Sequence, residues 1–253
     1  AWAAGVLSLD DAAALVARRG ALMQALPAGG GMAAVMAPED EVRRRLAAFG
    51  AAGTLAVAGV NAPTETVVAG ELDALARFRQ ACSADGLRVE PLAVSHAFHS
   101  PLMAAAADGL ADAAQRSTRH APRIAVVSSL SGAAADARWG TPEHWRAQLL
   151  APVRWLDAAR TVAAAPGIGI ALEIGPQAVL ATLGRRALPE APLAWLASMR
   201  RGTDEAVSVM AALGELYVRG AVDDWSGAAG AAARTRADLP TYPFQHQRYW
   251  PDA

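Results

Sequence analysis

The sequence has no lysine and only one cysteine, and each shortage excludes a class of protein. All 23 basic residues are arginines scattered among 24 acidic residues, so we expect neither nucleic acid nor an anionic membrane as a partner. The lone cysteine, Cys82, excludes internal disulfides. No cluster of Cys and His has metal-ligand spacing, and we therefore expect no metal site.

Long apolar runs are also missing, although the 253 residues are 53% hydrophobic and carry a formal charge of -1. A transmembrane helix needs roughly 18 to 20 apolar residues in succession, and no charged segment precedes an apolar start as in a signal peptide. The chain is long enough to bury the core of one or two domains. We expect a globular protein of the cytoplasm.

Alternating strand and helix patterns predict the class of fold. The segment LSLDDAAALVARRGALMQAL has apolar residues at helical spacing, with a capping serine, Ser8, before two early acids. After residue 100, apolar runs such as GIGIALEIGP alternate with helical segments, as in a parallel sheet covered by helices. We assign residues 1–31 and 96–200 to this large α/β subdomain, and we expect a strand in RIAVVSSLSG, residues 123–132.

Residues 32–95 show a different order of short units. Strand, helix, strand, strand, helix and strand patterns follow one another, and the strands are rich in Thr and Val. This βαββαβ order is that of a compact ferredoxin-like subdomain, which would be inserted within the α/β body. Residues 201–253 contain a last amphipathic helix, a polar linker and an aromatic ending, LPTYPFQHQRYW, which we expect to pack back in extended form.

The stretch VSHAFHSPLM, residues 94–103, places His96 and His99 three residues apart. As a metal pair they lack a third ligand nearby in sequence, and as core histidines they would be only structural. However, a side chain between the end of a strand and a helix emerges at the sheet edge where α/β proteins place their sites. The residues alone leave these alternatives open.

Arg18 and Arg19 present a similar choice. Neighbouring positions on a helix point about 100° apart, so one of the two can readily face inward. Two solvated arginines are the structural interpretation. The functional interpretation is a buried guanidinium that forms two parallel hydrogen bonds with a carboxylate.

Five blocks of sequence resemble the acyltransferase domain of modular type I polyketide synthases and, beyond them, bacterial malonyl-CoA:acyl carrier protein transacylases. These blocks are AGVLSLDDAAALVARRGALMQ, GVNAPTETVVAG, SHAFHSPLM, HWRAQLLAPVRW and LEIGPQAVLATL. The ending LPTYPFQHQRYW also resembles the linker that follows the acyltransferase domain in these synthases. The resemblance covers almost the whole chain, and it implies an α/β-hydrolase-like large subdomain with an inserted ferredoxin-like subdomain.

The resemblance implies catalytic roles for two residues. His99 takes the position of the general base, which removes a proton from a serine as the serine attacks a thioester. Gln148 takes the position whose backbone carbonyl orients that imidazole, where other triads have an aspartate.

The resemblance also implies contacts with the substrate. Arg19 matches the arginine that binds the free carboxylate of a malonyl group. Asn61 lies on the family's Asn-x-Pro turn, either as a positioning residue or as a turn former that satisfies its own backbone. HAFH resembles the malonyl form of its motif, so Phe98 would fill the space of an α-methyl group, and His96 would be a pocket wall. One methyl group is worth roughly 1 to 3 kcal/mol of selectivity.

The family's nucleophile is a serine in a Gly-x-Ser-x-Gly elbow, and no such pattern occurs in the 253 residues. The resemblance places this serine about seven residues before Ala1. Ser95 and Ser100 are too close to His99 along the chain to replace it. We therefore expect a domain truncated just after its elbow, lacking the N-terminal part of its large subdomain and inactive by itself.

The function implied is the loading of malonyl from malonyl-CoA onto an acyl carrier protein through an acyl-serine intermediate. The implied partners are malonyl-CoA, the acyl carrier protein with its own phosphopantetheine, and neighbouring synthase domains; we expect no cofactor bound to this chain. Two alternatives remain. One is a noncatalytic linker or docking fragment of a megasynthase, and the other is a discrete malonyl transacylase of fatty acid synthesis, although the YPFQHQRYW ending disfavours the latter.

Overall fold

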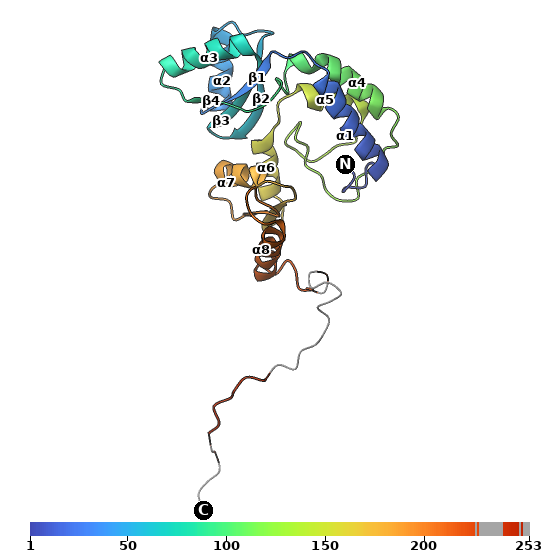
Figure 1. The fold of residues 1–253 in the computed structure, drawn as a ribbon, viewed down its shortest axis with the longest axis vertical. Helices are drawn as coiled ribbons and strands as arrows, with labels where there is room; N and C mark the ends of the chain where they lie inside the picture. The colour runs from blue at the N-terminus through green and yellow to red at the C-terminus, as the bar shows by residue number, and fades with distance from the viewer. Residues whose placement is uncertain (226, 228–239, 248, 250–253) are drawn as a thin grey trace, which may run out of the picture.

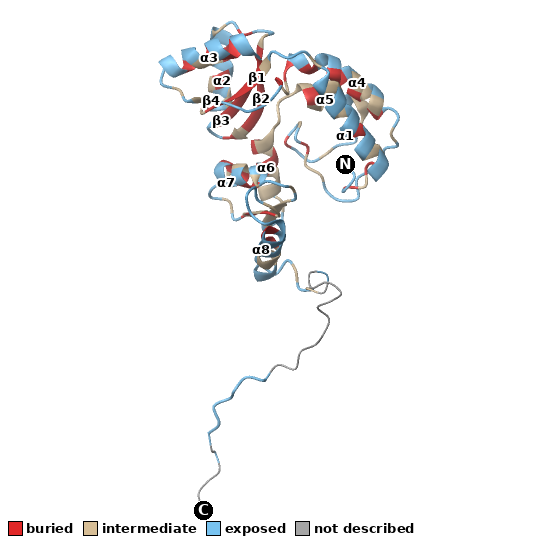
Figure 2. Ribbon diagram, viewed as in Figure 1, coloured by how far each residue is buried: buried red, intermediate tan, exposed pale blue. Residues whose placement is uncertain are grey.

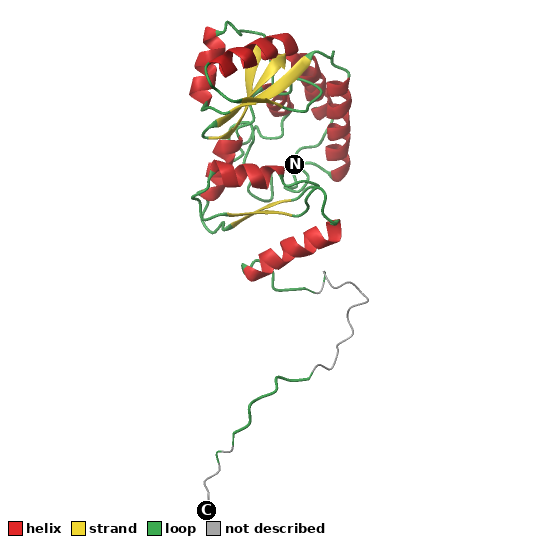
Figure 3. Ribbon diagram, turned by 60° about the vertical axis from the view of Figure 1, so that its left-hand side comes forward, coloured by secondary structure: helices red, strands yellow, loops and turns green. Residues whose placement is uncertain are grey.

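The computed structural model describes residues 1–225, 227, 240–247 and 249 (Figure 1). Within these residues the strands form one sheet of four and one sheet of two. Helices flank both sheets (Figure 3), so the predicted α/β class is confirmed. In the same part of the chain, no helix combines the length and the apolar character that crossing a membrane requires.

The four-stranded sheet belongs to the inserted unit and has the strand order β2-β3-β1-β4. Every neighbouring pair in it is antiparallel. This is the arrangement that the βαββαβ pattern predicts. In chain order the elements are β1 (Gly30–Val35), α2 (Glu39–Ala48), β2 (Leu55–Ala62), β3 (Glu65–Glu71), α3 (Leu72–Ala84) and β4 (Val89–Pro91).

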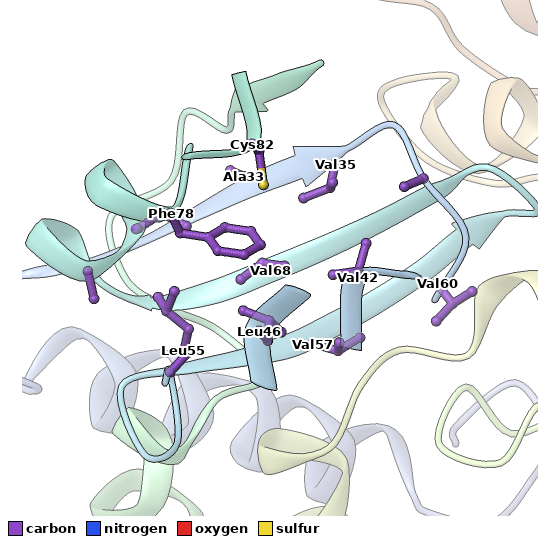
Figure 4. Close-up of a cluster of buried hydrophobic side chains, with 14 of the residues drawn as sticks. Ala33, Val35, Val42, Leu46, Leu55, Val57, Val60, Val68, Phe78 and Cys82 are labelled. Atoms are coloured by element: carbon purple, nitrogen blue, oxygen red, sulfur yellow. The ribbon is translucent and has the colours of Figure 1, made fainter. Parts of the chain in front are cut away.

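Nearly every residue of β1, β2 and β3 is buried (Figure 2). Since successive side chains of a strand point to opposite faces, both faces of these three strands are covered. On one face, α2 and α3 pack over Val35 and Val68 of the sheet, and Phe78 of α3 lies in the same core, as Figure 4 shows. Cys82 of α3 lies in this core. The opposite face packs against Ala97, so the VSHAFHSPLM segment is seated directly on the sheet.

A second group of helices packs beside the inserted unit. Ser8 caps the first of them, because its hydroxyl accepts the backbone N–H of Asp11 at 3.0 Å, as the sequence predicts. The helices share an apolar core that includes Val6, Leu110 and Leu149. They are α1 (Leu9–Gln24), the 3-10 helix η1 (Pro101–Met103), α4 (Ala104–Ala114) and α5 (Pro142–Leu150).

The two-stranded sheet is parallel. Its apolar core is shared with the helix that precedes its first strand and the helix that joins its two strands. Its elements are α6 (Trp155–Ala163), β5 (Ile170–Glu173), α7 (Val179–Ala187) and β6 (Ala194–Ala197), and α8 (Glu205–Val218) follows them.

The strand predicted at residues 123–132 is wrong. Only an isolated bridge forms there, between Val127 and Ala134. The chain turns back on itself, because Ser128 donates to the carbonyl of Ala133 at 2.9 Å and Gly132 adopts a left-handed φ of 72°. Glycine adopts that conformation without steric cost, so the segment reverses direction where a longer strand would have continued.

The expected packing of the C-terminal aromatic segment is also wrong for the residues that the structure describes. Residues 240–247 and 249 are all exposed. The rings of Tyr242 and Phe244 contact each other, with centroids 5.2 Å apart. Most of the preceding polar linker, residues 226–239, lies outside the described residues.

The connection between α5 and α6 joins the helical group to the inserted sheet. Val153 donates to the carbonyl of Ala58 at 2.9 Å, and its own carbonyl accepts from Val60 at 2.9 Å. Next to it, Arg154 forms an ion pair of 2.6 Å with Glu39 of α2. The connection is therefore held along the edge strand β2.

Gly30 offers a test of the contact between the sheet and the VSHAFHSPLM segment. A Cβ atom at Gly30 would lie 2.8 Å from the backbone nitrogen of Ala97. We expect Gly30→Ala to lower the free energy of unfolding by about 1–3 kcal/mol, because backbone must move to make room.

Gly20→Ala is the control, since a Cβ there meets nothing within 4 Å and alanine is the better helix former. Chemical denaturation of both variants measures the difference. Equal stability of the Gly30→Ala variant and the wild type would contradict the close approach.

Candidate active site

The loop that carries His99 is built around a buried serine. The Ser100 hydroxyl donates to the carbonyl of Ala97 at 2.7 Å and accepts the N–H of Leu102 at 3.3 Å. It thereby caps η1, which begins with Pro101 at a position where a missing N–H costs nothing. Because Ser100 is fully buried, its role here is to fix the loop.

His99 has an unusual backbone conformation. Its φ is 59°, and among the described residues it is the one non-glycine with a positive φ. Such a conformation costs roughly 1–3 kcal/mol and persists only where the surroundings enforce it. The strained backbone of His99 lowers the stability of the fold, and in return it fixes the direction in which the imidazole points.

Two backbone carbonyls determine the state of this imidazole. Its Nδ1 atom lies 3.1 Å from the carbonyl oxygen of Gln148 and 3.1 Å from that of Ala151. Carbonyl oxygens only accept, so Nδ1 carries the proton and Nε2 presents a lone pair. Within the described residues Nε2 has no hydrogen-bond partner, so it is free to act as a base.

The carbonyl of Gln148 is available because of Pro152. In a continuing helix, the N–H four residues later would bind this carbonyl, but proline has no N–H. Helix α5 ends at Leu150, and Ala151 continues in extended form with ψ of 158°. Sequence reasoning missed Ala151, although the Gln-Leu-Leu-Ala-Pro spacing contains the signal for a free carbonyl at Gln148.

Burial lowers the pKa of His99, and the nearby positive charge of Arg19 lowers it further. The two carbonyl contacts oppose this shift by stabilising the imidazolium, but the pKa of His99 remains below its ordinary value of 6.5. The imidazole is therefore neutral at pH 7, as a general base must be.

Arg19 and Arg18 have different surroundings. Arg18 is exposed and Arg19 is half-buried, so Arg19 is the one that faces inward. Its Nη1 atom donates to the side-chain oxygen of Gln148 at 2.7 Å. Among the described residues, no carboxylate forms an ion pair with Arg19. Burial lowers the pKa of Arg19, but a guanidinium stays charged in proteins, so this charge can bind an anion.

Arg19 borders a cavity of about 350 Å³. The other walls of this cavity are apolar, among them Leu15, Leu110 and Trp145. Apolar walls lower the polarity around the guanidinium and so strengthen its attraction for an anionic group.

Phe98 and His96 flank this arrangement from the same loop. Phe98 packs against both the helical core and the second face of the sheet, and its ring centroid lies 6.0 Å from that of His96. His96 is only 7% exposed. Its ring nitrogens lie 2.9 Å from the Ser95 hydroxyl and 3.4 Å from the carbonyl of Leu26, so His96 ties the loop to the segment after α1.

Asn61 is not joined to His99 or Arg19 by any hydrogen bond in the described residues. Near the end of β2, its amide nitrogen donates to Glu65 at 3.1 Å. Glu65 is 5% exposed, and its other oxygen accepts from Arg186 of α7. Sequence reasoning did not identify Glu65, although it lies in the GVNAPTETVVAG block, or Arg186, which lies outside every block.

Comparison with known proteins places this arrangement in a family. The sequence pattern of the acyl transferase domain matches residues 1–222. The chain belongs to the acyl transferase domain family. The predicted resemblance to the acyltransferase domains of polyketide synthases is thus confirmed.

Among its relatives is polyketide synthase GfsA of Streptomyces halstedii, to which this chain is 44% identical. The match covers 100% of this chain and 3% of GfsA. It also matches the mycoketide-CoA synthase of Mycobacterium tuberculosis, with 40% identity over 99% of this chain and 6% of that protein. The chain therefore spans only a small part of each of these relatives.

Two solved structures show the same fold. The acyltransferase domain from the second module of the salinomycin polyketide synthase has a TM-score of 0.86 and 39% identity, covering 96% of this chain and 57% of that one. The malonyl-CoA:acyl carrier protein transacylase of Xanthomonas oryzae has a TM-score of 0.72 and 33% identity, covering 83% of this chain and 67% of that one.

The effect of the Arg19 charge on the pKa of His99 can be tested by substitution. Because a positive charge disfavours the imidazolium, we expect Arg19→Ala to raise the pKa of His99 toward its ordinary value, with burial still holding it below. NMR titration of the imidazole signals measures this change.

Arg18→Ala removes the same charge from the neighbouring exposed position, and we expect it to leave the pKa of His99 unchanged. If both variants shifted the pKa of His99 equally, the assigned proximity of Arg19 would be wrong.

Proposed function

We propose that this acyltransferase domain loads malonyl from malonyl-CoA onto an acyl carrier protein through an acyl-serine intermediate. One observation carries the proposal: Gln148 contacts His99 through its backbone carbonyl and Arg19 through its side chain. A neutral base and an unpaired cation are thereby held at one place. A short thioester that ends in a carboxylate needs both groups.

In the proposed reaction, the Nε2 atom of His99 takes the proton of a serine hydroxyl as the serine oxygen attacks the thioester carbonyl. The carbon–sulfur bond then breaks, and the proton passes from His99 to the leaving thiol. The phosphopantetheine thiol of the carrier protein reverses these steps and takes the malonyl group. The proposal places the serine outside this chain, because the 253 residues contain no Gly-x-Ser-x-Gly elbow.

The remaining predicted residues have supporting roles in the proposal. Arg19 binds the malonyl carboxylate through paired N–H donors. Phe98 fills the space that an α-methyl group would need, and His96, whose ring lies 6.0 Å from that of Phe98, is a wall of the same pocket. Asn61 acts at the β2–β3 turn rather than at the base, which agrees with its bond to Glu65.

The known relatives support this proposal in two ways. GfsA is a polyketide synthase by name, which favours neighbouring synthase domains and a carrier protein as partners. The structure from Xanthomonas oryzae is that of a malonyl-CoA:acyl carrier protein transacylase, which favours malonyl as the group transferred. We propose no resident cofactor, since the phosphopantetheine arm belongs to the carrier protein.

Arg19→Ala in the full-length protein tests the substrate. Hydrogen bonds to a charged group contribute roughly 1.5–3 kcal/mol each, so the loss of a bidentate pair should lower kcat/KM for malonyl-CoA about 100-fold or more. Acetyl-CoA has no carboxylate, so its transfer should change far less, through the altered pKa of His99 alone.

Arg18→Ala is the matched control, and steady-state kinetics with both thioesters provide the measurement. An unchanged preference for malonyl over acetyl in the Arg19→Ala variant would rule out the carboxylate contact.

The isolated 253-residue chain gives a further test. We expect it to acquire no covalent label from radiolabelled malonyl-CoA, because its base has no elbow serine to activate. The full-length protein should acquire one label per domain. Stoichiometric labelling of the isolated chain would show that a nucleophile lies within it.

A further inference from the structure

We propose that the side chain of Gln148 is a positioning residue for the carboxylate contact, separate from the backbone carbonyl that holds His99. Its amide oxygen fixes the guanidinium of Arg19 in the orientation that receives the acyl carboxylate. This inference rests on the proposed function, because it concerns how that site selects a carboxylated acyl group.

The contact joins two helices that are distant in sequence. Arg19 lies on α1 and Gln148 on α5, 129 positions apart, and their donor and acceptor atoms are separated by 2.7 Å. That distance is typical of hydrogen bonds to a charged donor, which are stronger than neutral ones. An arginine side chain is long and has many rotamers, so a fixed acceptor removes freedom that the substrate would otherwise have to remove.

The neutral character of glutamine is essential to this role. A carboxylate at position 148 would hold Arg19 equally well, but it would also cancel the positive charge. Glutamine orients the guanidinium and leaves its charge uncompensated. In the described residues Arg19 makes no hydrogen bond other than the one to Gln148, so its remaining N–H donors can fork onto a ligand carboxylate.

Helix geometry lets one residue serve both groups independently. Backbone carbonyls run along a helix axis, whereas side chains project away from it. Accordingly, the carbonyl of Gln148 reaches His99 beyond the end of α5, while its amide reaches α1. A substitution at position 148 therefore changes only the contact with Arg19 and leaves the carbonyl in place.

Two substitutions in the full-length protein test the inference. Gln148→Met has a similar shape but no acceptor, and we expect it to raise KM for malonyl-CoA about tenfold or more with little change in kcat. Gln148→Glu keeps the bond to Arg19 and adds a competing negative charge, so it should raise this KM at least as much. Since Gln148→Glu retains the hydrogen bond, it remains informative if Gln148→Met does not fold.

The controls separate a specific effect from a structural one. Acetyl-CoA transfer should fall much less than malonyl-CoA transfer in both variants, whereas Gln80→Met, at an exposed position of α3, should match the wild type with both thioesters. In the Arg19→Ala background, Gln148→Met should have no further effect, because the two residues act as a unit.

Two results would overturn the inference: equal losses with malonyl-CoA and acetyl-CoA, or additive effects of Gln148→Met and Arg19→Ala. The kinetics of the wild type with malonyl-CoA and acetyl-CoA distinguish failure of this inference from failure of the proposed function. A wild-type protein with no preference for malonyl refutes the proposed function before any variant is measured. A wild-type protein that prefers malonyl, with a Gln148→Met variant that retains this preference, refutes only the role of the Gln148 side chain.

Discussion

The site depends on two carbonyl groups at the C-terminal end of α5 that receive the Nδ1 proton of His99. Pro152 makes this possible, because it removes the N–H that would otherwise pair with the carbonyl of Gln148. Next to it, Val153 pairs with the edge strand β2, which fixes the same connection against the inserted sheet. The orientation of the base therefore depends on how the two parts of the fold are joined.

Electrostatics follow from this placement. Half-buried His99 lies near the charge of Arg19, and both effects favour the neutral imidazole. Arg19 in turn has a neutral partner in Gln148, so its charge remains available. A carboxylate in the same place would have stabilised an ion pair and closed the site to anionic ligands. The left-handed backbone of His99 shows that the loop accepts local strain to reach this arrangement.

Sequence reasoning succeeded where the signal was local and failed where a turn intervened. The βαββαβ pattern predicts the sheet of residues 30–91, because its strands alternate between two buried faces. The apolar segment at residues 123–132 has a composition similar to that of those strands, but the chain reverses direction at Gly132. Strand propensity, which is a property of single residues, does not predict such a turn. Glu65 and Arg186 also escaped notice, since a contact between a hairpin and α7 leaves no periodic pattern in either segment.

The amino-acid sequence by itself determined the class of the fold, the capped start of α1 at Ser8, the end of α5 before Pro152 and, through its motifs, the family. Each of these depends on residues a few positions apart, whose steric and hydrogen-bonding preferences act locally. Only the tertiary structure decided that Arg19 and not Arg18 faces inward, and that it meets the side chain of Gln148. The apolar pattern of a helix predicts which of its faces is buried. Which residue meets Arg19 on that face depends on how α1 packs against α5, whose Gln148 lies 129 positions later in the sequence.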